Sequence, residues 1–157
     1  AKALGAKVLV TSSSGEKLIK AKSLGAGAGY DYTAEGWSQQ LLDEHGPVDL
    51  IIDSAGGAGY ASLIEAAAFG GRIVNYGATA GPPPKLDLFK VFWKQLHLIG
   101  STMGSPKDFE AMTALVDQKK IRPVIDRVLR FEQTDEAIKC FEQHGQFGKI
   151  VLRISGD

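Results

Sequence analysis

One stretch of the chain, residues 48–78, constrains the fold most strongly because it has the pattern of two buried strands joined by a helix. A short apolar run at residues 50–52 ends at Asp53, and a second run at residues 72–76 follows Gly70-Gly71. Continuous apolar runs of this length are typical of parallel strands that are covered on both faces. Between the runs, one helical stripe contains Leu63, Ile64, Ala67 and Ala68. We therefore predict a βαβ unit with a right-handed crossover.

The ends of these two strands are predicted to form a ligand-binding rim. In open parallel sheets, ligands bind beyond the carboxyl ends of the strands. The residues at these ends, after Asp53 and Asn75, are Ser54, Ala55, Gly56, Tyr76, Gly77 and Ala78. Because neighbouring parallel strands end at the same edge of a sheet, we expect the two groups to lie side by side. The proline-rich loop at residues 79–84 is expected to carry the chain across this rim.

The rest of the chain continues the alternation of strands and helices. Further strands are expected at residues 7–10, 29–32, 96–101, 125–131 and 149–154. Further helices are expected at residues 15–24, 37–44, 88–94, 106–119 and 134–142, the last capped by Thr134. Residues 1–4 have the pattern of the last turn of a helix, with Gly5 as its cap and no helix start before it. This order predicts an α/β fold with a doubly wound parallel sheet.

Charge and cysteine content exclude several classes of function. The chain has 18 basic and 18 acidic residues, so its balance does not favour a nucleic-acid partner. Its single cysteine, Cys140, excludes an internal disulfide framework. No apolar run approaches the roughly 20 residues of a membrane span, and no signal-peptide pattern opens the sequence. A soluble, cytoplasmic protein is therefore expected. His45, His97 and His144 have no metal-ligand spacing, and no metal site is predicted.

A glycine-rich motif at residues 57–62, Gly-Ala-Gly-Tyr-Ala-Ser, follows a predicted strand and opens a helix. A dinucleotide-binding fingerprint has this context, but its third glycine is Ser62 here, and the next strand ends without an acidic residue for a ribose. The alternative is a tight turn that lets the backbone approach a ligand. The glycines at residues 25–29 follow a helix and precede a strand, which indicates a cap and a connection.

Two other segments permit more than one interpretation. Residues 11–17, Thr-Ser-Ser-Ser-Gly-Glu-Lys, place hydroxyl groups and Lys17 around a helix start, which suits a phosphate group. The same residues are equally consistent with a simple helix cap and a solvated lysine. At residues 99–105, small residues surround Met103 at a strand end. Spacing alone favours an ordinary turn with a core methionine there.

The motifs, taken in order, resemble the cofactor-binding domain of the medium-chain dehydrogenase/reductase superfamily, most closely its quinone-oxidoreductase-like branch. They include A-K-x-L-G-A-K-V at the start, D-L-I-I-D-S-A-G-G, G-G-R-I-V-N-Y-G-A, L-I-G-S-T-M-G-S and the closing G-K-I-V-L. The resemblance covers essentially the whole chain. It implies a Rossmann-type sheet that lacks its first strand and glycine fingerprint, which would lie upstream of Ala1 together with the substrate domain. Residues 1–124 would belong to the cofactor domain, and residues 125–157 would return to the substrate domain.

The resemblance also implies positions for an NADP cofactor. Ser12, Ser13 and Lys17 would face the 2′-phosphate, with Tyr32 nearby. The ribose region would be lined by Ser54, Ala55 and Gly56, and the nicotinamide half by Tyr76, Gly77 and Ala78. The carboxamide would contact Met103 and Gly104, and the last strand would bring Lys149 near the cofactor. No catalytic residue is assigned, because the zinc ligands of such enzymes, where present, lie mainly in the other domain.

We therefore expect an NADPH-dependent oxidoreductase that transfers hydride to a quinone, enone or carbonyl compound. This chain would be its cofactor-binding portion and would be inactive alone. The resemblance further implies a homodimer formed through the edge strand at residues 96–101, which is rich in Leu and Ile. The alternative from another class is a nucleotide-binding regulatory or interaction module without catalysis.

Overall fold

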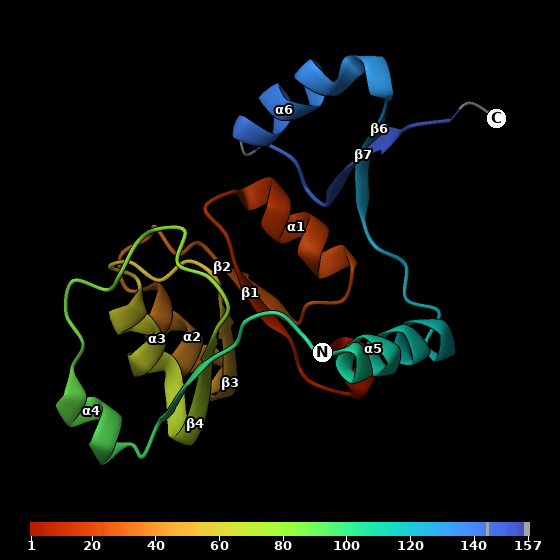
Figure 1. Cartoon of the computed structure of the whole chain (residues 1–157). Helices are drawn as coiled ribbons and strands as arrows, with labels where there is room; N and C mark the ends of the chain where they lie inside the picture. The colour runs from red at the N-terminus through yellow and green to blue at the C-terminus, as the bar shows by residue number, and fades with distance from the viewer. Residues whose placement is uncertain (144, 156–157) are drawn as a thin grey trace. The chain divides into compact units, whose positions relative to one another are not determined.

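The computed structural model describes residues 1–143 and 145–155, and His144 lies outside them (Figure 1). The chain divides between Gly104 and Ser105 into two units, Ala1–Gly104 and Ser105–Asp157. This division precedes the expected boundary between residues 124 and 125. The expected boundary separates the cofactor domain from the segment that would return to the substrate domain, and it stays a prediction.

The first unit consists of parallel strands joined by helices, as predicted. A single turn of 3₁₀ helix, Lys2–Leu4, ends at Gly5, whose φ of 84° is left-handed. Strand β1 (Leu9–Thr11) pairs in parallel with β2 (Ala28–Tyr30), and helix α1 (Gly15–Ser23) connects them. Helix α2 (Trp37–His45) leads into a second sheet with the order β3 (Val48–Asp53), β4 (Ala67–Asn75) and β5 (His97–Gly100), all parallel.

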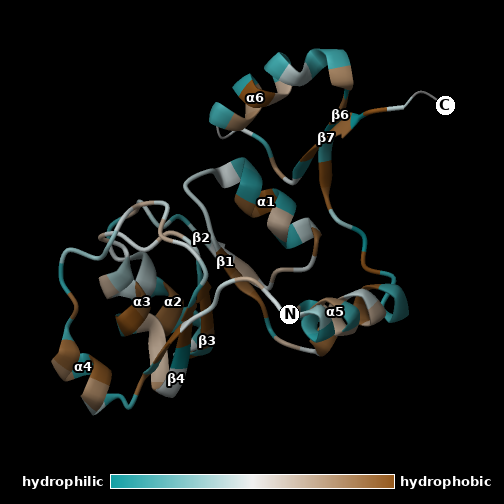
Figure 2. Cartoon of the chain, in the orientation of Figure 1, coloured by the Kyte–Doolittle hydropathy of each residue, from teal (hydrophilic) through white to brown (hydrophobic). Residues whose placement is uncertain are grey.

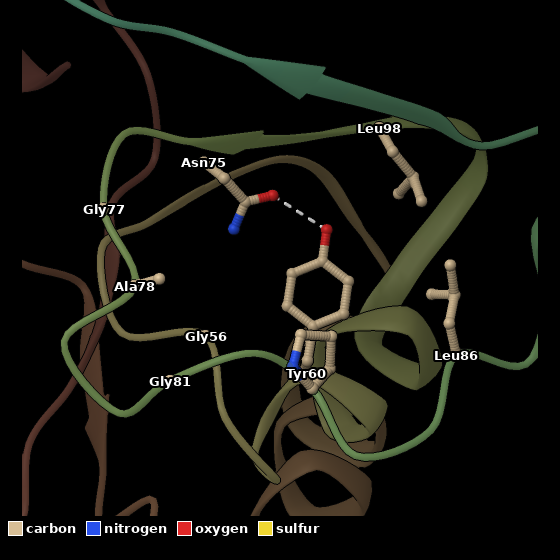
Figure 3. Close-up of a pocket in the computed structure, with 9 residues that line it drawn as sticks. Gly56, Tyr60, Asn75, Gly77, Ala78, Gly81, Leu86 and Leu98 are labelled. Carbon is tan, nitrogen blue, oxygen red and sulfur yellow. Dashed lines mark hydrogen bonds between the residues drawn. The ribbon is translucent and has the colours of Figure 1, made fainter.

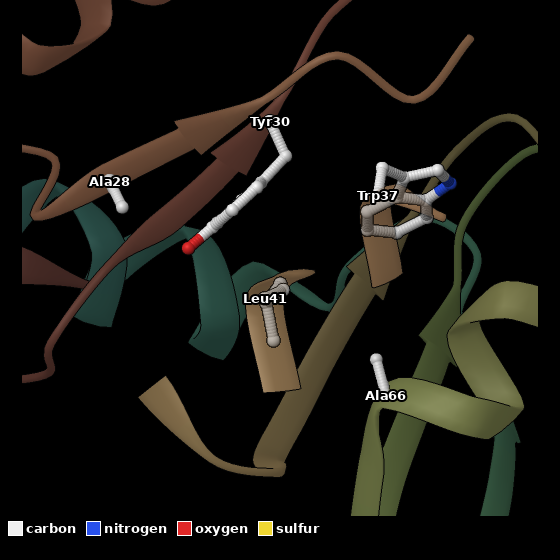
Figure 4. Packing of buried hydrophobic residues seen from close by; sticks show 5 residues of the cluster. All are labelled: Ala28, Tyr30, Trp37, Leu41 and Ala66. Atoms are coloured by element: carbon white, nitrogen blue, oxygen red, sulfur yellow. The ribbon is translucent and has the colours of Figure 1, made fainter. Parts of the chain in front are cut away.

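The expected sheet is interrupted between β1 and β3. Within the described residues, these strands belong to separate sheets, and no strand lies paired between them. By the resemblance described above, the first strand of a complete Rossmann-type sheet would pair between these two strands, and the break falls at this place. The two sheets nevertheless share one apolar cluster formed by Ala28, Tyr30, Trp37, Leu41 and Ala66, which is shown in Figure 4. Leu9 of β1 and Ile51 of β3 both pack against this cluster.

The boundary between helix α3 (Tyr60–Ala66) and strand β4 differs from the prediction. Ala67 and Ala68 were expected on the helical stripe, but both lie in the strand. The Lys94 ammonium donates to the carbonyl oxygens of Ile64 (3.0 Å), Glu65 (2.7 Å) and Ala67 (3.0 Å), and it thereby caps the carboxyl end of the helix. The sheet register then shifts, because Val48 pairs with Ala67 while Leu50 pairs with Arg72. Residues 68–71 form the resulting irregularity.

Helix α4 (Leu88–Trp93) connects β4 to β5 and is largely apolar, as its brown colour in Figure 2 shows. Lys90 forms an ion pair with Glu65 of α3. Phe89 contacts Phe92 edge to face, with a centroid distance of 5.1 Å, and stacks on Trp93. These aromatic side chains are exposed.

In its described residues, the second unit contains one pair of parallel strands, two α-helices and a short 3₁₀ turn. Helix α5 (Pro106–Gln118) begins with a capping box between Ser105 and Asp108. Strand β6 (Ile125–Arg130) pairs with β7 (Lys149–Arg153), and helix α6 (Thr134–Glu142) lies between them in sequence. The prediction that Thr134 caps α6 was wrong. The chain enters α6 directly from a 3₁₀ turn (Phe131–Gln133), and the Thr134 hydroxyl donates to the Phe131 carbonyl. No helix in the described residues is both long and apolar enough to cross a membrane.

Candidate functional site

Two loops meet at the carboxyl edge of the second sheet, as expected from the βαβ pattern. The first loop, residues 54–57, follows β3, and the second, residues 76–81, follows β4. Backbone hydrogen bonds join them: Tyr76 N donates to Asp53 O (3.1 Å), Thr79 N to Ser54 O (3.1 Å), and Ala80 N to Ala55 O (2.8 Å). We call these two segments the rim loops. Their pairing continues the contact between β3 and β4 beyond the ends of the strands.

Glycine is required where the rim loops approach each other. Gly56 has a φ of 66°, and a Cβ atom there would lie 2.6 Å from the Gly81 carbonyl oxygen. A Cβ atom on Gly77 would lie 2.9 Å from the Ser54 carbonyl oxygen. Real Cβ atoms are not found this close to oxygen, so any larger residue must displace the backbone. Gly56 and Gly77 therefore allow the two rim loops to pack against each other without side chains between them.

A mostly apolar cavity of about 230 Å³ lies beside the rim loops. Figure 3 shows its lining, which includes Tyr60, Asn75, Gly77, Ala78, Leu86 and Leu98. The Tyr60 hydroxyl points toward the Asn75 side chain and donates to Oδ1 at 2.8 Å. A cavity with apolar walls and a few polar groups is the usual form of a small-molecule site.

Asp53 anchors the first rim loop through its carboxylate. Oδ1 accepts from Ala55 N (3.1 Å), and Oδ2 accepts from Gly56 N (2.9 Å) and from Asn75 Nδ2 (2.9 Å). Burial of the Tyr60 ring and the negative charge of Asp53 both raise the pKa of the Tyr60 phenol. The sequence identified these strand ends but not the side-chain roles of Asp53, Asn75 and Tyr60. The available signal was an aspartate at the end of a strand, three residues before the glycine pair Gly56-Gly57.

The hydrogen bonds favour the tight-turn interpretation of the glycine motif over the dinucleotide fingerprint. Within the motif, Gly57 N donates to Gly81 O (2.8 Å), Tyr60 N to Gly57 O (3.2 Å) and Ser62 N to Gly59 O (3.1 Å), so these amides have partners within the protein. A fingerprint turn instead directs such amides at a pyrophosphate. Helix α3 is also short, with seven residues and no side-chain cap.

The serine-rich turn before α1 has a clear structural role. Ser14 is the N-cap of the helix, and its hydroxyl oxygen accepts from Lys17 N at 3.4 Å. Ser12 Oγ accepts from Ser14 N at 3.2 Å, and Ser12 N donates to Tyr30 O at 3.1 Å. The capping interpretation therefore holds for Ser14, which was not among the predicted site residues. Ser13 is exposed beside the same helix start.

The remaining predicted site residues lie outside the rim loops. Tyr32 lies two residues beyond β2 and is 53% exposed. Met103 is 94% exposed with a φ of 53°, so the core-methionine alternative was wrong. Gly104 follows it at the end of the first unit. Lys149 begins β7 in the second unit, and its proximity to a cofactor stays a prediction.

The family model for zinc-binding dehydrogenases matches residues 1–118. The chain belongs to this family. A zinc-type alcohol dehydrogenase-like protein of Leptosphaeria maculans is 34% identical over 162 residues, which cover 97% of this chain and 45% of that protein. An acryloyl-coenzyme A reductase of Sulfurisphaera tokodaii is 32% identical over 155 residues, covering 98% of this chain and 45% of the reductase.

Solved structures of related enzymes confirm the Rossmann-type α/β fold of the cofactor-binding domain in the medium-chain dehydrogenase/reductase superfamily. The crystal structure of an NAD-dependent alcohol dehydrogenase is 35% identical and superposes with a TM-score of 0.89, covering 99% of this chain and 46% of the dehydrogenase. A crystal structure named as an alcohol dehydrogenase from Sinorhizobium meliloti 1021 gives a TM-score of 0.90 at 35% identity, over 98% of this chain and 46% of that one. The chain thus spans less than half the length of these proteins.

The name of the zinc-binding dehydrogenase family raises the question of a metal ion. Among residues 1–143 and 145–155, no group of three or more His, Cys, Asp or Glu side chains is arranged to hold one. The described side chains therefore do not fit a zinc ion, and no zinc ligand is assigned to them.

Proposed function

We propose that this chain is the cofactor-binding portion of an NADPH-dependent oxidoreductase that transfers hydride to a quinone, enone or carbonyl substrate. The main observation in support is the pair of rim loops, joined backbone to backbone at the carboxyl edge of β3 and β4 beside an apolar cavity. Ligands of open parallel sheets bind at this edge. The names of the relatives, an alcohol dehydrogenase-like protein and a reductase, support the class of reaction.

In this proposal the rim loops hold the nicotinamide end of the cofactor. The nicotinamide supplies the hydride chemistry when it is bound, and the protein orients it. Gly77 and Ala78 line the cavity and would contact the nicotinamide half together with Tyr76. Ser54, Ala55 and Gly56 would line the ribose region.

The preference for NADPH over NADH is proposed from the residues that follow β1. Ser12 and Ser13 stand where an acidic residue would favour the unphosphorylated cofactor, and Lys17 lies in the first turn of α1. Hydroxyl groups, a helix N-terminus and an ammonium group together favour a phosphate group. Ser12 N is bonded to Tyr30 O, which brings this turn next to the end of β2, two residues before Tyr32.

The test is to measure binding and turnover in the full-length protein. NADPH and NADH are titrated by fluorescence, and their oxidation is followed with a quinone, an enone and an aldehyde. We expect tighter binding of NADPH and turnover with at least one acceptor. Binding without turnover on any acceptor would favour the regulatory module, and failure to bind either dinucleotide would contradict the proposal.

A matched pair of variants tests whether the rim is the site. Ala78 lines the cavity and is exposed, so Ala78→Trp should block the rim and abolish cofactor binding. Ala61→Trp places the same bulk at an exposed position of α3 and should bind normally. Equal affinity of the two variants would place the site elsewhere.

A further inference from the structure

The turn after β3 contains a carboxylate at the position where a ligand anion would otherwise bind. The Asp53 side chain folds back onto its own turn and accepts hydrogen bonds from the backbone amides of Ala55 (3.1 Å) and Gly56 (2.9 Å). Successive amides that converge on one point form an anion-binding concavity. Here the Asp53 carboxylate supplies the anion, so these two amide groups already have a partner.

Asn75 connects this carboxylate to the neighbouring strand and to helix α3. Its Nδ2 donates to Asp53 Oδ2 at 2.9 Å, and its Oδ1 accepts from the Tyr60 hydroxyl at 2.8 Å. The Tyr60 ring is 6% exposed and forms a wall of the cavity. The ends of β3 and β4 and the start of α3 are therefore held by one chain of hydrogen bonds. All three hydrogen bonds to Asp53 come from neutral amides, so its negative charge stays in the turn.

We propose that Asp53 is the positioning residue of the rim, acting through Asn75 and Tyr60. Its carboxylate occupies the amide groups of the turn, so a second anion does not bind there. It also holds the rim loops in the conformation that binds an uncharged part of the ligand. This inference rests on the proposed function, because it assigns the neutral nicotinamide and ribose part of the dinucleotide to the rim. The phosphate groups of the cofactor must then be bound elsewhere in the complete protein.

The first experiment removes the carboxylate and supplies a small one in solution. NADPH affinity is measured in the full-length protein for the wild type and for Asp53→Ala, with and without formate. Hydrogen bonds to a charged group predict a loss of at least about tenfold in the variant, and formate should restore most of it. Asp49 is exposed on the same strand, so Asp49→Ala should keep the wild-type affinity and should not respond to formate.

A second experiment compares a single variant at position 53 with a double variant that exchanges the side chains of Asp53 and Asn75. Asp53→Asn alone should weaken NADPH binding, because it places an amide donor against the Asn75 amide. In Asp53→Asn/Asn75→Asp, the introduced amide donates to the introduced carboxylate, which still accepts from Tyr60. Affinity should recover in part, because the hydrogen bond between positions 53 and 75 is restored with reversed polarity, while Gly56 N loses the oxygen that accepts from it in the wild type.

The outcomes separate this inference from the proposed function. If the wild type binds neither NADPH nor NADH, both proposals are overturned. If the wild type binds NADPH and Asp53→Ala binds it equally well, only the role of Asp53 is overturned. Circular dichroism reports folding for every variant. Should Asp53→Ala fail to fold, the double exchange decides: recovered affinity supports the proposal, and a folded double variant with the affinity of Asp53→Asn contradicts it.

Discussion

At the scale of single residues, Tyr30 gives a direct test of how the first sheet is stabilised. Its ring is 4% exposed, and its hydroxyl donates to Glu44 Oε2 at 2.8 Å. Burial is the largest cause that raises the pKa of this phenol from 10.0 to about 12, and the hydrogen bond and charge of Glu44 add to it. The folded protein therefore favours the neutral phenol.

The consequence for stability follows from the direction of this shift. The contribution of Tyr30 is fully present below its unfolded-state pKa of 10.0 and is lost as the pH rises toward about 12. We expect the urea midpoint of unfolding to fall across this interval, and Tyr30→Phe to flatten that part of the curve. An identical alkaline loss in Tyr30→Phe would show that another group is responsible.

Lys17 provides the residue-scale test of cofactor choice. Removing its ammonium should weaken NADPH binding by about 1 to 3 kcal/mol, the range for a hydrogen bond to a charged group, and should leave NADH binding nearly unchanged. Lys22→Ala, at an exposed position near the other end of α1, is the matched control. Isothermal titration of both cofactors measures the difference. Equal affinity of the wild type for NADPH and NADH would refute the proposed preference.

At the scale of elements, the end of α3 shows why boundaries are hard to predict from a local pattern. Ala66, Ala67 and Ala68 have no side-chain feature that distinguishes helix from strand, and the helical stripe continued through them. The group that caps the end of the helix is the ammonium of Lys94, which lies 27 residues beyond Ala67 in the sequence. A contact at this separation is not visible in a window of one or two helical turns.

Replacing Lys94 should therefore loosen the junction of α3 and β4. Lys94→Met keeps the aliphatic stem but leaves three carbonyl groups without their ammonium donor. We expect a loss of about 1 to 2 kcal/mol in the free energy of unfolding, measured with urea. Lys85→Met, in the exposed loop before α4, should change stability by less than about 0.5 kcal/mol. A loss of similar size in both variants would contradict the capping role.

At the scale of the whole molecule, strand β5 has an open edge. It pairs with β4 on one side, and the part of the chain that the structure describes offers no strand for the other. Leu98 and Ile99 are 38% and 41% exposed. An exposed apolar edge strand tends to pair with another chain, and pairing with its own copy satisfies both edges at once.

We propose that the full-length protein is a homodimer joined through β5. Ile99→Lys places a charge on this edge and should raise the dimer dissociation constant by about tenfold or more, measured by light scattering over a concentration series. Leu88→Lys introduces the same charge on exposed helix α4 and should leave the dimer intact. A monomeric wild type at micromolar concentration would exclude this assembly.

The sequence predicted most elements and the position of the rim, because apolar runs and glycine turns are local signals. It also predicted that the loops after β3 and β4 would lie together, which follows from parallel topology. It could not predict the chain of hydrogen bonds from Asp53 through Asn75 to Tyr60. Asp53 and Asn75 are 22 residues apart, and many polar pairs at such separations never meet. The exposure of the Met103 side chain was not predicted for a related reason, because the burial of a side chain in a turn depends on which distant segments pack over it.

The glycines of the rim also determine how this site can vary. A Cβ atom on Gly56, Gly57 or Gly77 would lie within 2.9 Å of another backbone or side-chain atom, so these positions resist substitution. The neighbouring Tyr76 and Ala78 are exposed and have no such restriction. In a library that samples every amino acid at each rim position, tolerated changes should concentrate at these exposed positions. A fixed main-chain frame with replaceable side chains lets a domain acquire a new ligand preference through single substitutions, without rebuilding its fold.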